Sequence, residues 1–428
     1  MLYTFYGDDF TGSTDVLEQL GSNNIPAVLF LGSPTPAHLA AFPNVQAIGI
    51  AGDSRSRSPE WMAANLPAIF ATLKEFGAQV THYKVCSTFD SSPLSGSIGR
   101  AIEIGLDIFS PHFIAIVVGA PHLRRYVAFG NLFAADHDGI IRRIDRHPMS
   151  HHPVTPMHEA DLRLHLGAQT ARKIGLIDIP TLGSGATSQT VDSLVAAGHK
   201  AILFDTVDIL TQSAVGTYLW TQAQHTPVFA AGSSGLTAAL ISAWDSLSML
   251  EDPPKPKPLA AVKPLLVVSG SCSERTQRQI HYALDRGYHG IRLDPIALMN
   301  PDGAARSAAL NSATSSLAAG QDTVLYTALG PTDATAHGAD LGTALGILLR
   351  DILAQAATPI RRVMLCGGDT SSHAVQQLGL YALTWATNLQ AGVPLCRAHA
   401  DSALHNLELV LKGGQVGTVD FFDIVRGA

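Results

Sequence analysis

The chain has 428 residues, enough for two or three domains of ordinary size, which excludes a single small module. Apolar residues make up 46% and charged residues only 15%, against roughly 25% charge in an average globular protein, which excludes an intrinsically disordered chain. The formal net charge is −7 and no run of five basic residues occurs, so the composition argues against nucleic acid as a partner.

The cysteines and the N-terminus indicate a cytoplasmic protein. Four scattered cysteines, at positions 86, 272, 366 and 396, suit neither a disulfide framework nor a CxxC metal site, and predict reduced thiols. The opening MLYTFYGDDF reaches two aspartates before a signal-like stretch forms, and the apolar run 113–118 is far shorter than the 18 or so residues that span a bilayer. We therefore expect neither secretion nor membrane insertion.

Short apolar runs alternate with helical patterns over the first 250 residues. We expect strands at 2–7, 27–31, 45–50, 113–120, 201–205 and 227–232, and helices at 14–20, 59–75 and 97–105. This alternation predicts βαβ units around a parallel sheet.

Residues 140–170 interrupt this pattern with three prolines and several histidines, and predict an irregular excursion that enters a helix near Glu159. Such an excursion is typical of a lid or binding loop. The histidines at 147, 151, 152, 158 and 165 raise the alternative of a zinc site, but the prolines break the regular spacing of a preformed site, so surface or substrate-contacting histidines are favoured.

Five prolines and three lysines between 251 and 264 predict a semi-rigid linker. It separates a domain at 1–250 from a domain at 265–428. The second domain has strand-like runs at 265–270, 290–294, 323–329 and 362–368, each followed by a possible helix. The predicted fold class is therefore α/β, with two domains that each hold a mainly parallel sheet.

Paired carboxylates follow the first predicted strand. Asp8 and Asp9 stand between Gly7 and Gly12, where a parallel sheet presents its ligand-binding edge. Together they could take a proton from a hydroxyl group or hold a cation; the alternative for one of them is a helix N-cap.

Cationic and hydroxyl side chains follow two further strands. Arg55 could bind a carboxylate through two parallel hydrogen bonds while Asp53 and Ser54 read neighbouring hydroxyls, as a polyhydroxy acid requires. The alternative is that Asp53 and Ser54 cap a helix. Lys84, followed by Ser87 and Thr88 and by a glycine turn at 96–99, could hold an anion, and Cys86 is expected to be an inert thiol.

Three glycine turns in the second domain follow predicted strands. They are SGSCSERT at 269–276, CGGDTSS at 366–372 and KGGQVG at 412–417, and they place backbone N–H groups, hydroxyls and Lys412 where a phosphate could bind. Glycine turns before helices are common, but three in one domain favour phosphate or nucleotide binding. The chain lacks the P-loop, Rossmann, nucleophile-elbow and HExxH signatures, which disfavours those enzyme classes.

Eight segments, in order along the chain, resemble the motifs of the four-carbon acid sugar kinase family: GDDFTGSTD, DSRS, YKVCSTFDS, HPVTPM, GSSG, SGSCSERT, CGGDTSS and KGGQVG. The resemblance implies an ATP-dependent kinase whose N-terminal domain binds an acid sugar, whose C-terminal domain binds the nucleotide, and whose chemistry lies in the cleft between them.

Residue by residue, the resemblance and the motifs above give two sets of expected contacts. The acid sugar would be contacted by Asp8 or Asp9, Asp53, Ser54, Arg55, Lys84, Ser87 and Thr88. ATP would be contacted by Ser271, Ser273, Gly367, Gly368, Asp369, Thr370, Lys412, Gly413 and Gly414.

We expect phosphoryl transfer from ATP to a terminal hydroxyl of a tetronate or 3-oxo-tetronate, with Asp9 as base or orienter and Asp8 as second choice. Mg²⁺ would be held largely by phosphate oxygens and water.

The resemblance is incomplete in one motif. Many members of the family read Lys-x-x-Asp-Ser-Thr-x-Arg-Gly, whereas this chain reads KVCSTFD at 84–90. This difference makes a branched acid such as 3-oxo-isoapionate an alternative substrate. Two rivals remain: a non-catalytic sensor, and a lyase using Lys84 as a Schiff base. The composition permits a homodimer.

Overall fold

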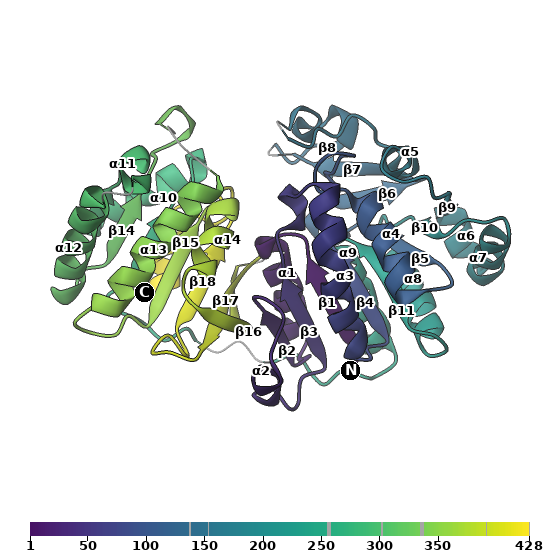
Figure 1. The fold of residues 1–428 in the computed structure, drawn as a ribbon. Coiled ribbons are helices and arrows are strands. Elements are labelled where there is room, and N and C mark those ends of the chain that lie inside the picture. Colours follow the sequence, from purple (N-terminus) through teal and green to yellow (C-terminus); the bar gives the residue numbers. More distant parts are fainter. Residues whose placement is uncertain are drawn as a thin grey trace. The chain divides into compact units, whose positions relative to one another are not determined.

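The computed structural model describes residues 1–136, 138–152, 154–254, 258–300, 303–333, 338–390 and 392–427, with the side chain of Asp369 left out. The chain divides into two compact units (Figure 1). The N-terminal unit comprises Met1–Ala27 and Ala40–Pro253, and the C-terminal unit comprises Val28–Leu39 and Pro254–Ala428. None of the described helices is long and apolar enough to cross a membrane.

A parallel sheet of seven strands forms the centre of the N-terminal unit. Its order is β3 (Ala47–Ala51), β1 (Tyr3–Gly7), β4 (Val80–Lys84), β11 (Val228–Gly232), β5 (Ile114–Val117), β10 (Ala201–Phe204) and β9 (Ile174–Ile177). The larger helices are α1 (Phe10–Ser22), α3 (Pro59–Glu75), α4 (Ile98–Phe109), α7 (Thr187–Ala196), α8 (Ile209–Ala223) and α9 (Ser234–Ser246).

Alternation along β1 shows that helices cover both faces of this sheet. Tyr3 packs edge-on against Trp244 of α9, whereas Tyr6, on the opposite face, packs edge-on against Phe70 of α3, each with 6.3 Å between ring centres. Every residue of β1 and of β4 is buried, as expected for strands that are covered on both faces. Ser58 and Pro59 start α3 as an N-cap followed by a proline in the first turn.

The predicted excursion at 140–170 is more ordered than its sequence suggests. A small antiparallel sheet of β6 (Arg125–Ala128), β7 (Asn131–Ala135) and β8 (Ile141–Arg143) leads into it. Short helical turns follow, and α5 (Leu162–Gly167) begins after Asp161, which caps it, a few residues beyond the expected Glu159. This unit also contains the short helix α6 (Ile179–Ser184), whereas α2 (Pro36–Ala40) belongs to the C-terminal unit except for its last residue.

The strands of the C-terminal unit form the mixed part of the sheet. Five parallel strands are ordered β13 (His289–Arg292), β14 (Thr323–Tyr326), β12 (Leu266–Ser269), β15 (Arg362–Cys366) and β18 (Glu408–Lys412). Antiparallel β17 (Val393–Ala400), β16 (Leu380–Gln390) and β2 (Ala27–Phe30) extend it. Its helices are α10 (Glu274–Asp285), α11 (Pro295–Met299), α12 (Ala304–Ala318), α13 (Ala339–Gln355), α14 (Gly368–Gln376) and α15 (Phe421–Arg426).

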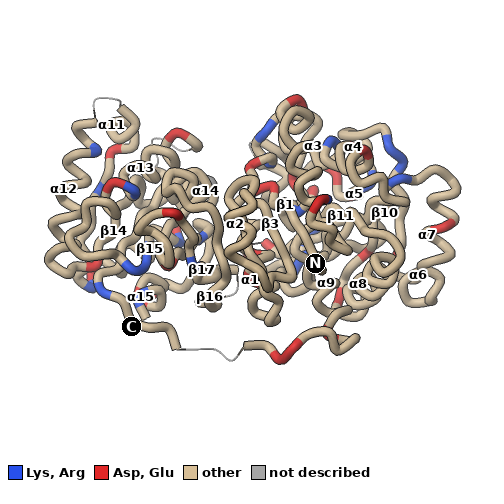
Figure 2. Tube along the Cα trace, turned by 60° about the horizontal axis from the view of Figure 1, so that its bottom comes forward, with Lys and Arg blue, Asp and Glu red and all other residues tan. Residues whose placement is uncertain are grey.

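The strand β2 belongs mostly to the C-terminal unit, although the sequence places it in the first domain. Leu29 and Phe30 pair with Leu383 and Ala382 of β16, and His38, just beyond, stacks on Tyr381. The periodicity of residues 27–31 predicts a strand but not its partner, because pairing of strands distant in sequence depends on the folded topology. Figure 2 shows Lys and Arg interspersed with Asp and Glu in both units, with long uncharged stretches between them.

Candidate active site

Asp9 follows β1 and has both of its carboxylate oxygens bonded. Oδ1 accepts a hydrogen bond of 2.6 Å from the N–H of Gly12 and so caps α1, while Oδ2 forms an ion pair of 2.8 Å with Nη1 of Arg55. The capping role and the electrostatic role that the sequence leaves as alternatives are therefore combined in one side chain.

Asp8 is buried and only partly bonded. Its backbone N–H donates to the carbonyl of Lys84 at 2.9 Å, and its carbonyl accepts from the N–H of Arg55 at 3.0 Å, which fixes its place between the ends of β4 and β3. Its Oδ1 has no hydrogen-bond partner in the described part of the chain. Burial, and then the neighbouring charge of Asp9, raise the pKa of Asp8 to about 8.

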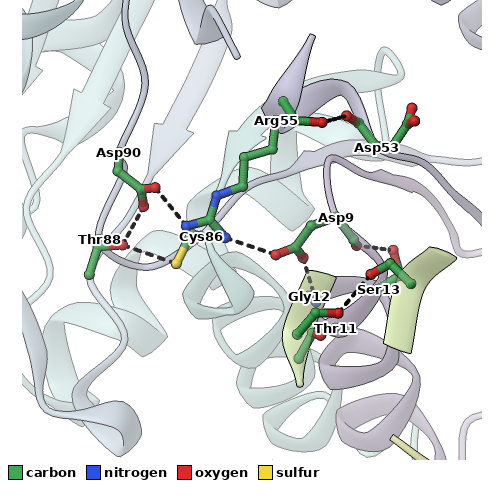
Figure 3. A network of polar contacts seen from close by, with 12 residues as sticks. Asp9, Thr11, Gly12, Ser13, Asp53, Arg55, Cys86, Thr88 and Asp90 are labelled. Carbon is green, nitrogen blue, oxygen red and sulfur yellow. Dashed lines mark hydrogen bonds and ion pairs between the residues drawn. The ribbon is translucent and has the colours of Figure 1, made fainter. Parts of the chain in front are cut away.

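Arg55 bridges two carboxylates, Asp9 on one side and Asp90 on the other (Figure 3). Nη2 contacts Oδ2 of Asp90 at 2.6 Å, and the Asp90 side chain is completely buried. Burial alone would raise the pKa of Asp90, but the charge of Arg55 and the hydroxyl of Thr88 hold it below its usual value. Asp90 is therefore a buried anion that fixes the guanidinium.

Further hydroxyl groups converge on Asp90. Thr88 donates from Oγ1 to Oδ1 of Asp90 at 2.5 Å and also lies 3.0 Å from Sγ of Cys86, and Thr155 donates to Oδ2 at 3.3 Å. Nδ1 of His152 lies 3.1 Å from Oγ1 of Thr155. Thr155 and His152 of the HPVTPM segment are thus connected to the ion pair between Arg55 and Asp90. Cys86 is partly buried, and burial raises the pKa of its thiol.

Lys84, at the end of β4, is buried beside the first turn of α1. No described residue accepts a hydrogen bond from its ammonium group, unlike the guanidinium of Arg55. A Cβ placed on Gly12 would lie 2.7 Å from Nζ of Lys84 and 2.5 Å from Oδ1 of Asp9. Glycine at position 12 therefore provides the space that the ammonium and the cap occupy.

The remaining residues expected around the acid sugar are placed differently. Asp53 pairs with Arg57, and Oγ of Ser54 bonds to the hydroxyl of Tyr83 at 3.0 Å in the interior. Ser87 is half-buried, with no side-chain hydrogen bond to a described residue. The structure thus brings together Asp8, Asp9, Arg55, Lys84 and Thr88.

Sequence reasoning missed Asp90, Thr155 and His152 as partners in this network. Asp90 stands in the quoted CSTFD segment, so its proximity to Lys84 in sequence was an available signal. Thr155 lies 65 residues further on, and only the fold reveals its contact with Asp90.

In the C-terminal unit, the loops after β12, β15 and β18 lie at the carboxyl ends of three neighbouring parallel strands. Ser273 caps α10 by accepting from the N–H of Thr276, and its hydroxyl donates to the carbonyl of Gly414. Oγ of Ser271 lies 3.1 Å from Oγ1 of Thr276. The SGSCSERT and KGGQVG turns are therefore bonded to each other.

Lys412 has its ammonium group fully engaged within these loops. Nζ bonds to Oγ1 of Thr276 at 3.0 Å, to the carbonyl of Gly413 at 3.1 Å and to the carbonyl of Val416 at 3.2 Å, in a nearly inaccessible position. Burial lowers its pKa. These three bonds use its three donors, so Lys412 holds the loop in shape rather than offering a free ligand.

The CGGDTSS turn begins α14 at the end of β15. Gly367 has a φ of 116°, a conformation that side chains rarely adopt, and precedes the helix. A Cβ on Gly270 would lie 2.5 Å from the side chain of Thr370, so this turn packs closely on the end of β12. Oγ of the buried Ser371 has no partner in the described part of the chain, whereas the expected Asp369 side chain lies outside the described residues.

The histidine-rich segment lines a separate hollow of about 570 Å³ in the N-terminal unit. Its lining includes Asp136, Asp145, His147, His151 and His158. Within the described residues, no group of three or more His, Cys, Asp and Glu side chains has an arrangement that could hold a metal ion.

Two family models match successive parts of the chain. Residues 3–240 match the model of a sugar-binding N-terminal domain, and residues 266–422 match the model of a nucleotide-binding C-terminal domain. The chain is 44% identical to the 3-oxo-isoapionate kinase of Paraburkholderia graminis, with 100% of this chain and 94% of the relative covered. It is 31% identical to the 3-oxo-tetronate kinase of Pectobacterium atrosepticum, with 97% and 96% covered.

Solved structures agree with these matches. A crystal structure of a Haemophilus influenzae protein superposes with a TM-score of 0.74 at 26% identity and covers 99% of each chain. A Salmonella typhimurium LT2 protein gives a TM-score of 0.80 at 24% identity, with 99% and 98% covered, and supports the fold alone. On the two domain matches and the full-length relatives, the chain belongs to the four-carbon acid sugar kinase family.

Proposed function

We propose that this kinase transfers the terminal phosphoryl group of ATP to a terminal hydroxyl group of a short oxo acid sugar, with Asp8 as the general base. The observation that carries the proposal is the unpartnered, buried oxygen of Asp8 beside two cations, Arg55 and Lys84. Phosphoryl transfer needs little covalent chemistry from the protein, so a positioned base, cations and a phosphate cradle are the parts to look for.

Asp8 suits the role of base better than Asp9. A base needs a free lone pair that can approach the substrate hydroxyl, and both oxygens of Asp9 already accept strong hydrogen bonds. The pKa of Asp8, raised to about 8, lies near a neutral working pH, where general-base catalysis is most effective. Asp9 is then the residue that orients Arg55 and fixes the start of α1.

Arg55 and Lys84 supply the donors for the substrate carboxylate. Arg55 uses one N–H of each terminal nitrogen on Asp9 and Asp90, which leaves three of its five N–H donors for a ligand. Lys84 forms no ion pair with a carboxylate of the described residues, so an incoming carboxylate would pair with it without displacing a protein group. We propose that both bind the acid, and that Thr88 and Ser87 line its hydroxyls.

The glycine turns of the C-terminal unit suit the phosphates of ATP. The starts of α10 and α14 present free backbone N–H groups at the ends of adjacent strands, an arrangement that favours anions. We propose that Ser271, Ser273, Gly367, Gly368, Thr370, Gly413 and Gly414 contact the nucleotide. We propose that Mg²⁺ arrives with ATP, bound largely by phosphate oxygens and water.

Among short oxo acids, we propose 3-oxo-isoapionate as the preferred acceptor over 3-oxo-tetronate. The support is the 44% identity to the 3-oxo-isoapionate kinase of Paraburkholderia graminis, against 31% to the 3-oxo-tetronate kinase of Pectobacterium atrosepticum. A branched and a linear acid place a hydroxyl-bearing carbon differently, and a pocket can discriminate such differences by about 1–3 kcal/mol.

The test is an assay of ADP release by the purified chain with MgATP and a panel of 3-oxo-isoapionate, 3-oxo-tetronate and a plain tetronate, with the product mass measured. We expect a phosphorylated acid and a higher kcat/KM for 3-oxo-isoapionate. Preference for 3-oxo-tetronate would overturn the substrate assignment alone. Silence across the panel in a protein that still binds ATP would overturn the acceptor class.

A further inference from the structure

The C-terminal unit has a hollow at the start of β15 and β18, whose other ends lead into glycine turns. A hollow of about 460 Å³ lies where β15 and β18 begin, and we call it the Arg361–Arg397 hollow. Arg361 immediately precedes β15, Glu408 begins β18, and Arg397 lies on β17 directly opposite Glu408. Because β15 and β18 are parallel, the hollow lies at the amino ends of these strands and the glycine turns lie at their carboxyl ends.

The lining of this hollow has an excess of positive charge. Its one carboxylate, Glu408, is already paired with the fully buried Arg362, whose Nε lies 2.8 Å and whose Nη2 lies 2.6 Å from Oε2. Neither Arg361 nor Arg397 forms an ion pair or a side-chain hydrogen bond with a described residue, and His405 adds a third basic group. Two guanidinium groups therefore remain available to a ligand.

The backbone around the hollow is held in one shape. Asn406 has a φ of 71°, its N–H donates to the carbonyl of Ala398, and the N–H of Ala398 donates to the carbonyl of Leu407. The N–H of Leu407 closes the turn on Leu404. A preformed rim reduces the ordering that a ligand would otherwise impose.

The pKa of His399, also on β17, is affected by two of the basic residues that line the hollow. Burial, together with the positive charges of His405 and Arg397, lowers its pKa to about 4. The Nε2 of this histidine lies 2.9 Å from Oγ1 of Thr384. The positive charge of the hollow therefore contributes to the lowered pKa of His399.

We propose that the Arg361–Arg397 hollow is a binding site for a small anion with two or more negative charges, such as inorganic phosphate or a short polycarboxylate. Guanidinium groups bind such ligands through paired N–H···O bonds, and two of them on one rim favour a ligand with several oxygens. The site is separate from the glycine turns and does not depend on the proposed reaction. Solvated arginines without a ligand are the alternative.

The experiment titrates inorganic phosphate, and separately citrate, into the full-length protein by calorimetry in the presence of saturating ADP, which keeps phosphate from the nucleotide turns. The test variant is Arg361→Gln with Arg397→Gln. The matched control is Arg350→Gln, because Arg350 is half exposed on α13 and, among the residues that the structure describes, forms an ion pair with its neighbour Asp351 alone. Thermal unfolding without phosphate verifies that each variant is folded.

We expect saturable binding of at least one of the two anions by the wild type and by the Arg350 variant, with affinity reduced at least about tenfold in the double variant, the loss of roughly one charge-assisted contact. Equal affinity in the double variant would overturn the proposal, as would the absence of saturable binding of both anions by the wild type. In a parallel titration without ADP, binding by the double variant that disappears when ADP is added would assign that anion to the nucleotide turns instead.

Discussion

Arg55 is held between Asp9 and Asp90, with its two terminal nitrogens 2.8 Å and 2.6 Å from their carboxylate oxygens. The two acids lie in different environments, since Asp9 caps α1 at the surface of the unit and Asp90 is completely buried. The guanidinium is thus oriented before any ligand arrives, and its unused donors keep a fixed direction.

Replacement of Asp90 by asparagine is expected to disturb both stability and substrate binding. The change leaves Arg55 without its buried counter-charge, so the free energy of unfolding should fall by about 1–3 kcal/mol. The KM for the acid sugar should rise while the KM for ATP stays constant. Denaturant unfolding and steady-state kinetics measure the two effects.

The control for Asp90→Asn is Asp53→Asn, which affects an ion pair with the more exposed Arg57 and should cost less than about 1 kcal/mol. If both variants behaved alike, burial of Asp90 would have no special importance for Arg55.

Gly12→Ala tests the close approach of Lys84 to α1. The added methyl group would lie 2.7 Å from the ammonium and 2.5 Å from the capping oxygen of Asp9, so one of them must move. We expect the KM for the acid to rise by about tenfold, the equivalent of about 1.4 kcal/mol. Gly183→Ala in α6, where a Cβ meets open space, is the matched control and should leave the KM unchanged.

A stable Gly12→Ala protein with wild-type kinetics would contradict the proposed role of Lys84. Loss of folding would be surprising, because alanine favours a helix over glycine by about 1 kcal/mol.

Lys412→Met removes three hydrogen bonds that hold the 413–416 turn, while it keeps the bulk of the side chain. The turn should loosen, and the KM for ATP should rise at least about tenfold with little change in the KM for the acid. Lys74→Met, which removes a single bond to the carbonyl of Ile108 in the N-terminal unit, is the control. An unchanged KM for ATP would separate Lys412 from nucleotide binding.

Acid should destabilise the N-terminal unit through buried histidines. Burial lowers the pKa of His82 to about 3 and that of His165 to about 4. The unfolded chain, with a histidine pKa near 6.5, binds more protons than the folded one below that pH, so stability falls as the pH decreases from about 6.5 towards 4.

At pH 5 each of these histidines should cost about 2 kcal/mol relative to neutral pH. Urea unfolding at pH 7.5 and pH 5, followed by the signal of the N-terminal unit, checks this. In His82→Gln the loss between the two pH values should be smaller than in the wild type. An equal loss would show that other groups cause the acid sensitivity.

Much of the sheet and of its ligand-binding edge was predictable, because local patterns determine them. The strand that ends at Gly7, the carboxylates after it and the glycine turn after Ser269 each follow from a short stretch of sequence. Hydrogen bonds between distant residues were not predictable. Thr155 contacts Asp90 across 65 residues, and Leu29 pairs with Leu383, and no periodicity in either segment encodes its partner.

The role of Lys412 and the choice between the two aspartates also required the structure. Sequence position makes Lys412 a cation beside a glycine turn, but its donors are already bonded to Thr276 and to two carbonyls. Asp8 and Asp9 are adjacent and chemically identical in sequence, and only their surroundings differ: one is a bonded cap, and the other has a free buried oxygen.

The most direct test of the central claim compares the wild type with Asp8→Asn and Asp9→Asn for ADP release and product mass with MgATP and 3-oxo-isoapionate, over a range of pH. The account predicts that the wild-type kcat/KM for the acid, which reports groups of the ligand-free enzyme, rises with pH until Asp8 is deprotonated, near its pKa of about 8, and then levels off. It predicts that Asp8→Asn loses at least about a hundredfold in kcat with both ligands still bound, and that Asp9→Asn loses less because asparagine can still cap α1. A kcat of Asp8→Asn equal to that of the wild type, or a greater loss in Asp9→Asn, would contradict Asp8 as the base.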